Sequence, residues 1–150
     1  MASSTTSTDV DAPRPLDVDN GVELEALLSV VPERVAAAVR AHDDEALLEI
    51  VLDLGRPPAI RYSSGELLLD ESEVTEQELE YVVRQVSEFG EDNRAGIERT
   101  LHRISAIRNR RGRIVGLTLR AGRAVGGSAG VVRDLVESGR SILLLGRPGV

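Results

Sequence analysis

The chain has 150 residues, 41% of them hydrophobic, and a formal net charge of −7, which fits one domain with a core or one domain and the start of a second. Aromatic residues make up only 2% and cysteine is absent, so the core must be aliphatic and disulfides, thiolate metal sites and a cysteine nucleophile are excluded. No apolar run approaches the roughly 20 residues that cross a bilayer, and we expect no membrane span. A zinc site or a Ser–His triad would have to use His42 or His102, for which a surface or packing role is the simpler interpretation.

Residues 1–20 are predicted to form a disordered acidic tail. They are rich in Ser and Thr, as transit peptides are, but they carry four Asp residues against one Arg. Transit peptides are poor in acidic residues, whereas a charged segment with few apolar residues favours disorder.

Two short helices are predicted next, at residues 21–31 and 32–42. Pro32 suits the first turn of the second helix. Apolar residues recur at helical spacing in both segments, at Val22, Leu24, Leu27, Leu28 and Val31 and at Val35, Ala36 and Val39.

Three short strands should follow these helices. From Glu49 to Leu54 apolar and polar residues alternate, which indicates a strand with one buried face. Gly55 and the two prolines at 57–58 end it. Further strands are predicted at 59–62 and 66–69, with a turn at 63–65 between them.

The segment 75–90 carries the clearest helix signal in the chain. Thr75 is a predicted N-cap, and Glu78 three residues later completes a capping box. Gly90 is the predicted C-cap. The acidic residues of this helix are most simply its solvated face.

A β-hairpin is predicted from two strand-like runs, 100–109 and 113–122, which meet at a turn containing Gly112. Ile104 and Ala106 should share one face of the first run, and Val115, Leu117 and Leu119 one face of the second. Residues 21–125 are therefore expected to form an α+β domain in which helices pack on a small antiparallel sheet.

Charge is divided unevenly along the chain. Residues 1–100 hold 8 Arg and 23 acidic residues, and residues 101–150 hold 10 Arg and 2 acidic residues. Seven arginines lie on or around the hairpin, at Arg103, Arg108, Arg110, Arg111, Arg113, Arg120 and Arg123. The hairpin is thus predicted to be a positive patch that faces away from the acidic helix at 76–89. The patch suits a stand-alone nucleic-acid-binding module or a subunit-assembly module, although it lacks aromatic residues for base stacking.

Residues 126–150 suggest the start of a second, incomplete domain. A glycine-rich connector at 126–130 precedes a short predicted helix that ends at Gly139 and a predicted strand from Ile142 to Leu145. Gly146 then occupies the first position of a P-loop, whose four free positions would be filled by Arg147, Pro148, Gly149 and Val150. The Gly-Lys-Ser/Thr that completes this motif would come next.

The runs "DNRAGIERTLHRISAIRNR" and "DLVESGRSILLLGRPGV" resemble a P-loop ATPase family of cyanobacteria and chloroplasts. Members of that family end in an Arg-x-x-x-His module implicated in single-stranded nucleic acid binding. They are related to stage III sporulation protein AA and, distantly, to secretion and twitching-motility ATPases. The resemblance covers residues 21–150 and implies that 126–150 begin a RecA-like α/β domain whose ATPase core is missing here.

The resemblance also implies a set of ligands and partners. ATP and Mg²⁺ would bind the full-length family member, but this chain lacks the Lys and Ser/Thr of the motif, so alone it should be inactive and without cofactor. Arg120 and Arg123 are the candidates to reach a nucleotide, by analogy with secretion ATPases. The expected partners are the missing core, other copies of the chain and single-stranded nucleic acid. A bacterial or cyanobacterial cytoplasm is the expected location, with the plastid stroma as the alternative.

Overall fold

The computed structural model describes residues 20–42, 46–69, 72–123, 128–143 and 145–147. These residues fall into two units that are described separately. One spans residues 19–124, and the other contains the described residues from 128 onward. The predicted tail, as far as residue 19, and residues 126–127 of the predicted connector lie outside the described residues.

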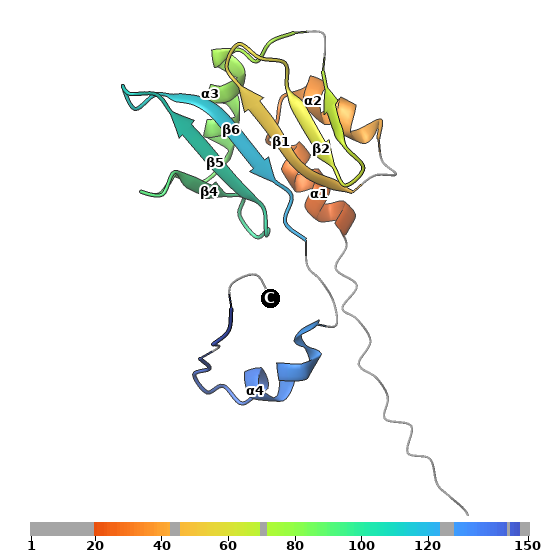
Figure 1. Cartoon of the computed structure of the whole chain (residues 1–150), viewed down its shortest axis with the longest axis vertical. Helices are drawn as coiled ribbons and strands as arrows, with labels where there is room; N and C mark the ends of the chain where they lie inside the picture. Colours follow the sequence, from red (N-terminus) through yellow and green to blue (C-terminus); the bar gives the residue numbers. More distant parts are fainter. Residues whose placement is uncertain (1–19, 43–45, 70–71, 124–127, 144, 148–150) are drawn as a thin grey trace, which may run out of the picture. The chain divides into compact units, whose positions relative to one another are not determined.

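A six-stranded antiparallel sheet forms the centre of the first unit, in the order β3-β2-β1-β6-β5-β4 (Figure 1). Its strands are β1 (Leu47–Asp53), β2 (Ala59–Tyr62), β3 (Glu66–Leu68), β4 (Arg94–Gly96), β5 (Arg103–Arg108) and β6 (Ile114–Arg120). The first three strands pair consecutively, as do the last three, and β1 pairs with β6 to join the two halves. This central pairing places an acidic part of the chain beside its arginine-rich part.

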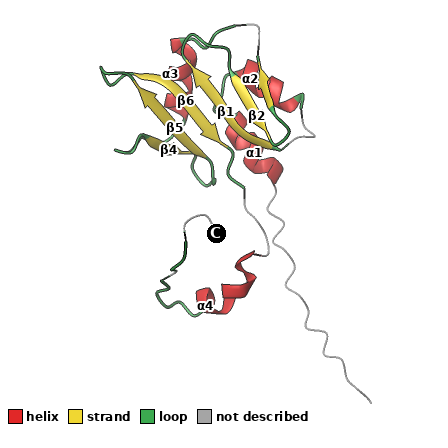
Figure 2. Cartoon of the chain, in the orientation of Figure 1, coloured by secondary structure: helices red, strands yellow, loops and turns green. Residues whose placement is uncertain are grey.

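Three helices pack on one face of this sheet (Figure 2). They are α1 (Asn20–Leu28), α2 (Glu33–Arg40) and α3 (Glu76–Gln85). Each contributes buried aliphatic side chains to one continuous core, among them Leu27, Leu28, Val35, Val39, Leu79 and Val82. The opposite face of the sheet, here called the uncovered face, receives none of the described helices of this unit.

Alternation along the central strands decides which side chains enter the core. Ile50 lies opposite Leu119 and Leu52 opposite Leu117 across β1 and β6, and all four are fully buried. Burial of each such side chain stabilises the fold by roughly 1.5–3 kcal/mol. Because side chains alternate between the faces of a strand, the residues between these point to the uncovered face.

An ion pair ties α2 to the start of α3. The Nε of Arg34 donates to Glu78 at 2.7 Å and its Nη2 donates to the second carboxylate oxygen at 3.0 Å. Glu78 also closes the predicted capping box, since it accepts from the backbone N–H of Thr75 at 2.9 Å. The side chains of Arg34 and Glu78 are only 31% and 21% exposed, so this pair is screened less than a surface pair.

His102 joins the helical layer to the sheet. Its Nε2 donates to the carbonyl of Glu23 in α1 at 2.6 Å, and its Nδ1 accepts from the backbone N–H of Gly122 at 3.0 Å. The ring is 5% exposed. At Gly122 an added Cβ would overlap the carbonyl group of Leu101, so only glycine allows the chain leaving β6 to approach this closely.

The structure confirms the α+β class and the small antiparallel sheet with helices. It adds β4, which the sequence analysis missed because "RAG" has no apolar alternation. The predicted C-cap at Gly90 is wrong. The helix ends at Gln85 because Val86 is extended and the N–H of Ser87 donates to Gly96 in β4 instead. A bulge between Ile107 and Arg108 in the β5–β6 pairing moves Val115 out of the predicted common face.

The second unit contains a 3-10 turn, Ser128–Val132, followed by α4 (Arg133–Glu137). Gly139 has a positive φ of 66° just after this helix, as a C-terminal glycine often does. The predicted strand Ile142–Leu145 is wrong. Its described residues have no regular structure, and Leu143 and Leu145 are 82% and 87% exposed. No described strand pairs with this segment, and an unpaired strand has no ladder to stabilise it.

Gly122→Ala tests the junction around His102. We expect the free energy of unfolding to fall by at least about 2 kcal/mol, because the Cβ forces the backbone apart and leaves the buried Nδ1 of His102 without its donor. Urea unfolding followed by far-UV circular dichroism measures this, as the chain has no Trp. Gly130→Ala is the control, since nothing lies within 4 Å of a Cβ built there. Equal stability of the two variants would contradict the account.

Glu78→Gln tests the Arg34 ion pair. We expect the free energy of unfolding at neutral pH to fall by about 1–2 kcal/mol, between the values for exposed and buried pairs. Hydrogen bonding from Arg34, against a smaller opposing effect of burial, holds the pKa of Glu78 below its usual 4.5. The charged carboxylate therefore stabilises the fold above the unfolded-state pKa, and this contribution is lost as the pH falls through the lower folded-state value.

The gap in stability between the wild type and Glu78→Gln should consequently shrink in urea titrations below pH 4.5. Glu80→Gln is the matched control, because Glu80 forms an exposed pair with Arg84 on the same helix. Its effect should stay within about 0.5 kcal/mol. Equal losses in the two variants, or a gap that persists undiminished at about pH 3, would show that the pair has no special role.

Candidate functional site

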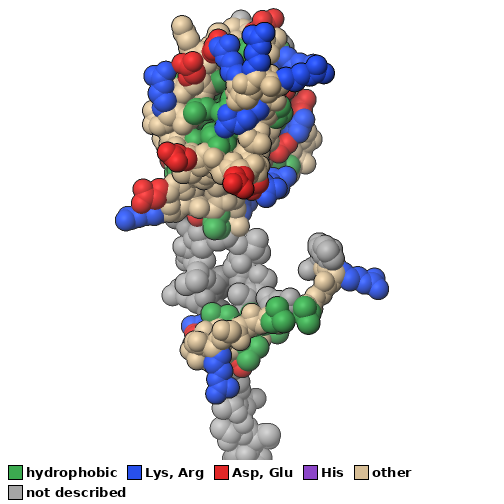
Figure 3. Space-filling view, turned by 90° about the vertical axis from the view of Figure 1, so that its left-hand side faces the viewer, with side chains coloured by type: hydrophobic (Ala, Val, Ile, Leu, Met, Phe, Trp, Pro, Cys, Tyr) green, Lys and Arg blue, Asp and Glu red, His purple; other side chains and the backbone are tan. Residues whose placement is uncertain are grey.

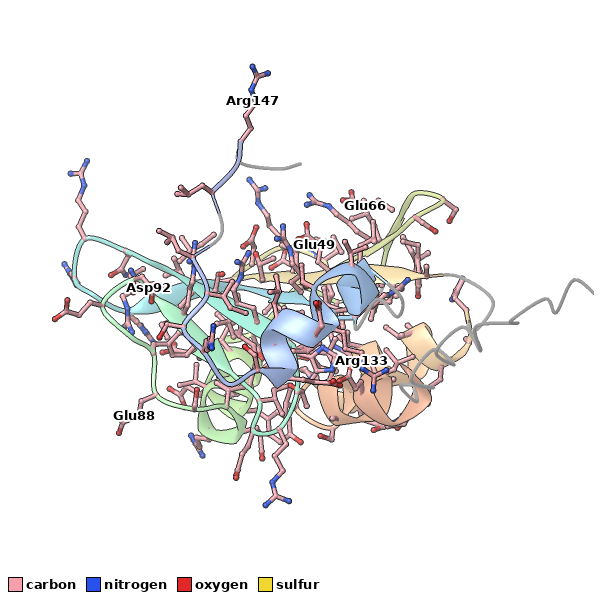
Figure 4. All side chains as sticks on the ribbon, turned by 90° about the horizontal axis from the view of Figure 1, so that it is seen from below. Glu49, Glu66, Glu88, Asp92, Arg133 and Arg147 are labelled. Atoms are coloured by element: carbon pink, nitrogen blue, oxygen red, sulfur yellow. The ribbon has the colours of Figure 1, made fainter. Side chains whose placement is uncertain are left out.

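One row of charged residues crosses the uncovered face from β3 to β5. The strand register places Glu66 opposite Arg61, Arg61 opposite Glu49, Glu49 opposite Arg120, and Arg120 opposite Arg103. Figure 4 shows Glu49 and Glu66 on the side of the sheet away from the helices of this unit. The row therefore lies on the surface that the core does not use.

The first half of this row is neutralised by ion pairs. Arg61 donates through Nε to Glu66 at 2.6 Å and through Nη1 to Glu49. These hydrogen bonds, with that to Glu66 the larger, raise the pKa of Arg61. The carboxylates on both neighbouring strands are thus committed to Arg61.

The second half of the row is not neutralised. Arg103 and Arg120 lie directly opposite each other on β5 and β6, and like charges in this position destabilise a sheet. Neither side chain forms a hydrogen bond or ion pair with the described residues, and the Nε of Arg103 is a buried atom without a partner there. We call Arg103 and Arg120 the arginine pair.

A shallow hollow of about 370 Å³ opens beside the arginine pair. Leu48, Glu49, Arg61, Arg120 and Ala121 line it. Leu48 is 47% exposed, so the hollow combines an apolar wall with guanidinium groups. It is suited to a side chain of a partner molecule and is too open to enclose a small ligand.

The turn of the β5–β6 hairpin carries further arginines. Asn109 holds this turn by accepting from the N–H groups of Arg111 and Arg113 at 2.9 and 3.1 Å. The side chains of Arg110 and Arg111 are exposed and have no partner within the described part of the chain. Figure 3, which views the left-hand side of Figure 1, shows arginine side chains gathered at the top with acidic side chains between them, where Figure 1 places the turn.

The predicted orientation of the hairpin patch needs a correction. Arg113 forms an ion pair with Glu76 of α3, and Arg108 and Arg113 line a hollow with Leu79 and Val83 of the same helix. These two arginines therefore lie beside the acidic helix, at the turn end of the hairpin beyond the bulge in the β5–β6 pairing. Arg103 and Arg120 lie on the uncovered face, on the other side of the sheet from this helix.

Arg123, the other predicted site residue of the sheet unit, does not join the arginine pair. Arg123 donates to the carbonyl of Leu47 at 2.8 Å and so has a structural role. Gly146 and Arg147 belong to exposed chain without regular structure, and residues 148–150 lie outside the described residues. Among the described residues no group of His, Cys, Asp or Glu could hold a metal ion.

Arg120 was predicted, with Arg123, as a residue that reaches a nucleotide, and not as the partner of Arg103. Arg103 was one of seven arginines around the hairpin, and nothing in its local sequence set it apart. Alternation within β5 could have assigned Arg103 to the polar face opposite Ile104. Its position across from Arg120 follows only from the register, which the bulge after Ile107 shifts.

The chain is similar to curated proteins that are considerably longer. Protein SEEDLING PLASTID DEVELOPMENT 1 of Arabidopsis thaliana is 51% identical over 130 residues, 86% of this chain and 19% of that protein. The uncharacterized protein ycf45 of Porphyra purpurea is 50% identical over 129 residues, 85% of this chain and 23% of that protein. The uncharacterized protein ycf45 of Cyanidium caldarium is 45% identical over 129 residues, 85% of this chain and 38% of that protein.

No protein family model matches the chain, and no solved structure matches it. Among the described residues no helix is long and apolar enough to cross a bilayer. The chain spans between 19% and 38% of the lengths of these curated relatives.

These comparisons overturn the assignment to the P-loop ATPase family. One of these relatives is named for seedling plastid development and two are named as uncharacterized ycf45 proteins; none of the three is named as an ATPase. No family model supports the assignment either. The ATPase function is therefore wrong, and the resemblance that implied ATP and Mg²⁺ no longer supports them. The fold agrees, since the described residues just before Gly146 form no buried strand that could present a phosphate loop. The relatives are consistent with a plastid or cyanobacterial origin of the chain.

Proposed function

We propose that residues 19–124 form a protein-binding module whose uncovered face docks an acidic protein surface at the arginine pair. The observation that carries this proposal is that Arg103 and Arg120 oppose each other without a carboxylate partner among the described residues. A fold gains nothing from two adjacent unpaired cations, whereas a partner that supplies carboxylates relieves their repulsion.

The geometry of the pair suits carboxylates. A guanidinium group presents its N–H donors in a planar fork that matches a carboxylate. Neighbouring strands lie about 4.8 Å apart, so the two forks can engage two carboxylates side by side. The hollow beside Leu48 and Ala121 adds an apolar contact to the charged ones.

A protein partner fits this face better than a nucleic acid does. Proteins that bind single strands on a sheet stack bases on aromatic side chains. On the uncovered face the described residues facing outward are charged, small or aliphatic, such as Val51, Ala59 and Thr118. Tyr62 is buried and Phe89 packs against the core, so neither offers a stacking platform.

In the curated relatives the matching region is part of a longer polypeptide. The module would act in the same setting. One relative is named for seedling plastid development. A docking module of this kind would contribute to such a process by bringing an acidic partner to the rest of the protein.

Binding of fluorescent poly-L-glutamate to the full 150-residue chain tests the proposal. We expect binding at low salt that weakens as salt rises, although the net charge of −7 opposes it. The double variant Arg103→Glu/Arg120→Glu should lose at least about tenfold in affinity, the loss of roughly one charged contact or more. Fluorescence anisotropy measures both effects.

Arg40→Glu/Arg84→Glu is the matched control, because it changes the net charge equally at two exposed arginines of α2 and α3, which pack on the opposite face of the sheet. It should retain most of the affinity. Arg120→Gln should bind less tightly while its stability is unchanged or higher, since the substitution relieves repulsion. Absence of poly-L-glutamate binding, equal losses in the two double variants, or preferential binding of a single-stranded oligothymidylate would overturn the proposal.

A further inference from the structure

We infer that the acidic partner is a second copy of this chain, whose α3–β4 turn docks on the arginine pair. This inference rests on the proposed function and names its partner. The turn, here called the acidic turn, comprises residues 88–92 and presents Glu88, Glu91 and Asp92. All three are exposed, and within the described part of the chain Glu88 and Glu91 have no ion-pair partner.

The acidic turn is held in one conformation by backbone hydrogen bonds. The N–H of Ser87 donates to Gly96 at 3.0 Å, and the N–H of Gly90 donates to Arg94 at 2.9 Å. Asn93, in the left-handed region at a φ of 58°, donates to the carbonyl of Gly90 at 2.9 Å and closes the turn.

Side-chain contacts fix the acidic turn to the hairpin that carries the arginines. The Nε of Arg108 donates to the side chain of Asn93 at 2.7 Å, and the N–H of Ala106 donates to its carbonyl at 2.9 Å. The backbone of the turn is therefore preorganised, and little backbone entropy is lost when it meets a partner. A rigid acidic turn is the kind of surface that the arginine pair requires.

One copy cannot satisfy its own arginine pair with its own acidic turn. Figure 4 shows Glu88 and Asp92 at the β4 rim of the unit, whereas Glu49 and Glu66, which share the charged row, lie on the uncovered face. The backbone contacts hold the turn at that rim. Two different surfaces that complement each other let copies associate either head to tail or reciprocally about a twofold axis.

The β4 edge of the sheet, next to the acidic turn, is not open for a second copy to pair with as an added strand. Gly96 in β4 accepts from the N–H of Ser87 and donates to its hydroxyl at 2.9 Å, so the chain before the turn occupies the outer side of β4. Copies therefore do not extend the sheet at this edge, and contact through the charged side chains remains.

Sedimentation equilibrium of the full chain tests the inference. We expect concentration-dependent association at low salt that disappears as salt rises. Glu88→Arg/Glu91→Arg and Arg103→Glu/Arg120→Glu should each abolish it when examined alone. A mixture of the two should form a 1:1 dimer and nothing larger, because the first variant keeps a functional arginine pair and the second keeps a functional acidic turn.

Glu73→Arg/Glu98→Arg is the control, since it changes the charge equally at exposed positions outside the acidic turn; this variant should associate like the wild type. A chain that stays monomeric but binds poly-L-glutamate through the arginine pair would overturn the second copy as partner and leave the proposed function standing. A chain that neither associates nor binds poly-L-glutamate would overturn both this inference and the proposed function. Association that survives the variants, or a mixture that stays monomeric, would also contradict the inference.

Discussion

The close approach of Gly122 to His102 is the constraint on which the rest of the first unit depends. One buried imidazole accepts from the strand exit and donates to α1, so a single side chain links the helical layer to both arms of the hairpin. Protein interiors tolerate buried polar groups only when they are hydrogen-bonded, and both ring nitrogens of His102 are. The contact is possible because residue 122 has no side chain to strike Leu101.

This junction also determines where the arginine pair lies. Arg103 follows His102 directly, and Arg120 precedes Gly122 by two residues, so fixing the junction fixes the end of the β5–β6 pairing at which the two arginines meet. The repulsion between them is opposed by the aliphatic core on the other side of the same strands, where Ile104 lies opposite Leu119. A surface that is unfavourable by itself is thereby held in place by the core, as is common at binding sites.

Local signals in the sequence were sufficient to predict much of this fold but little of its candidate site. The capping box at Thr75 and Glu78 and the turn at Gly112 are formed by residues close in sequence, so their patterns could be interpreted directly. The end of α3 could not, because tertiary pairing of Ser87 with β4 overrides the helix. At the chain's end, three consecutive leucines predicted a buried strand, but an apolar run forms a strand only where neighbouring strands pair with it. The arginine pair depends on register between strands, which alternation within one strand does not specify.

The most direct test of the central claim is to observe the arginine side chains themselves. In the full chain labelled with ¹⁵N, the Nε–H resonances of Arg61, Arg103 and Arg120 can be assigned and followed by NMR as poly-L-glutamate is added. The account predicts that Arg103 and Arg120 shift together and saturate at the same concentration, while Arg61, already bound to Glu49 and Glu66, changes little. Shifts confined to Arg110 and Arg111 at the hairpin turn, with Arg103 and Arg120 unchanged, would contradict it.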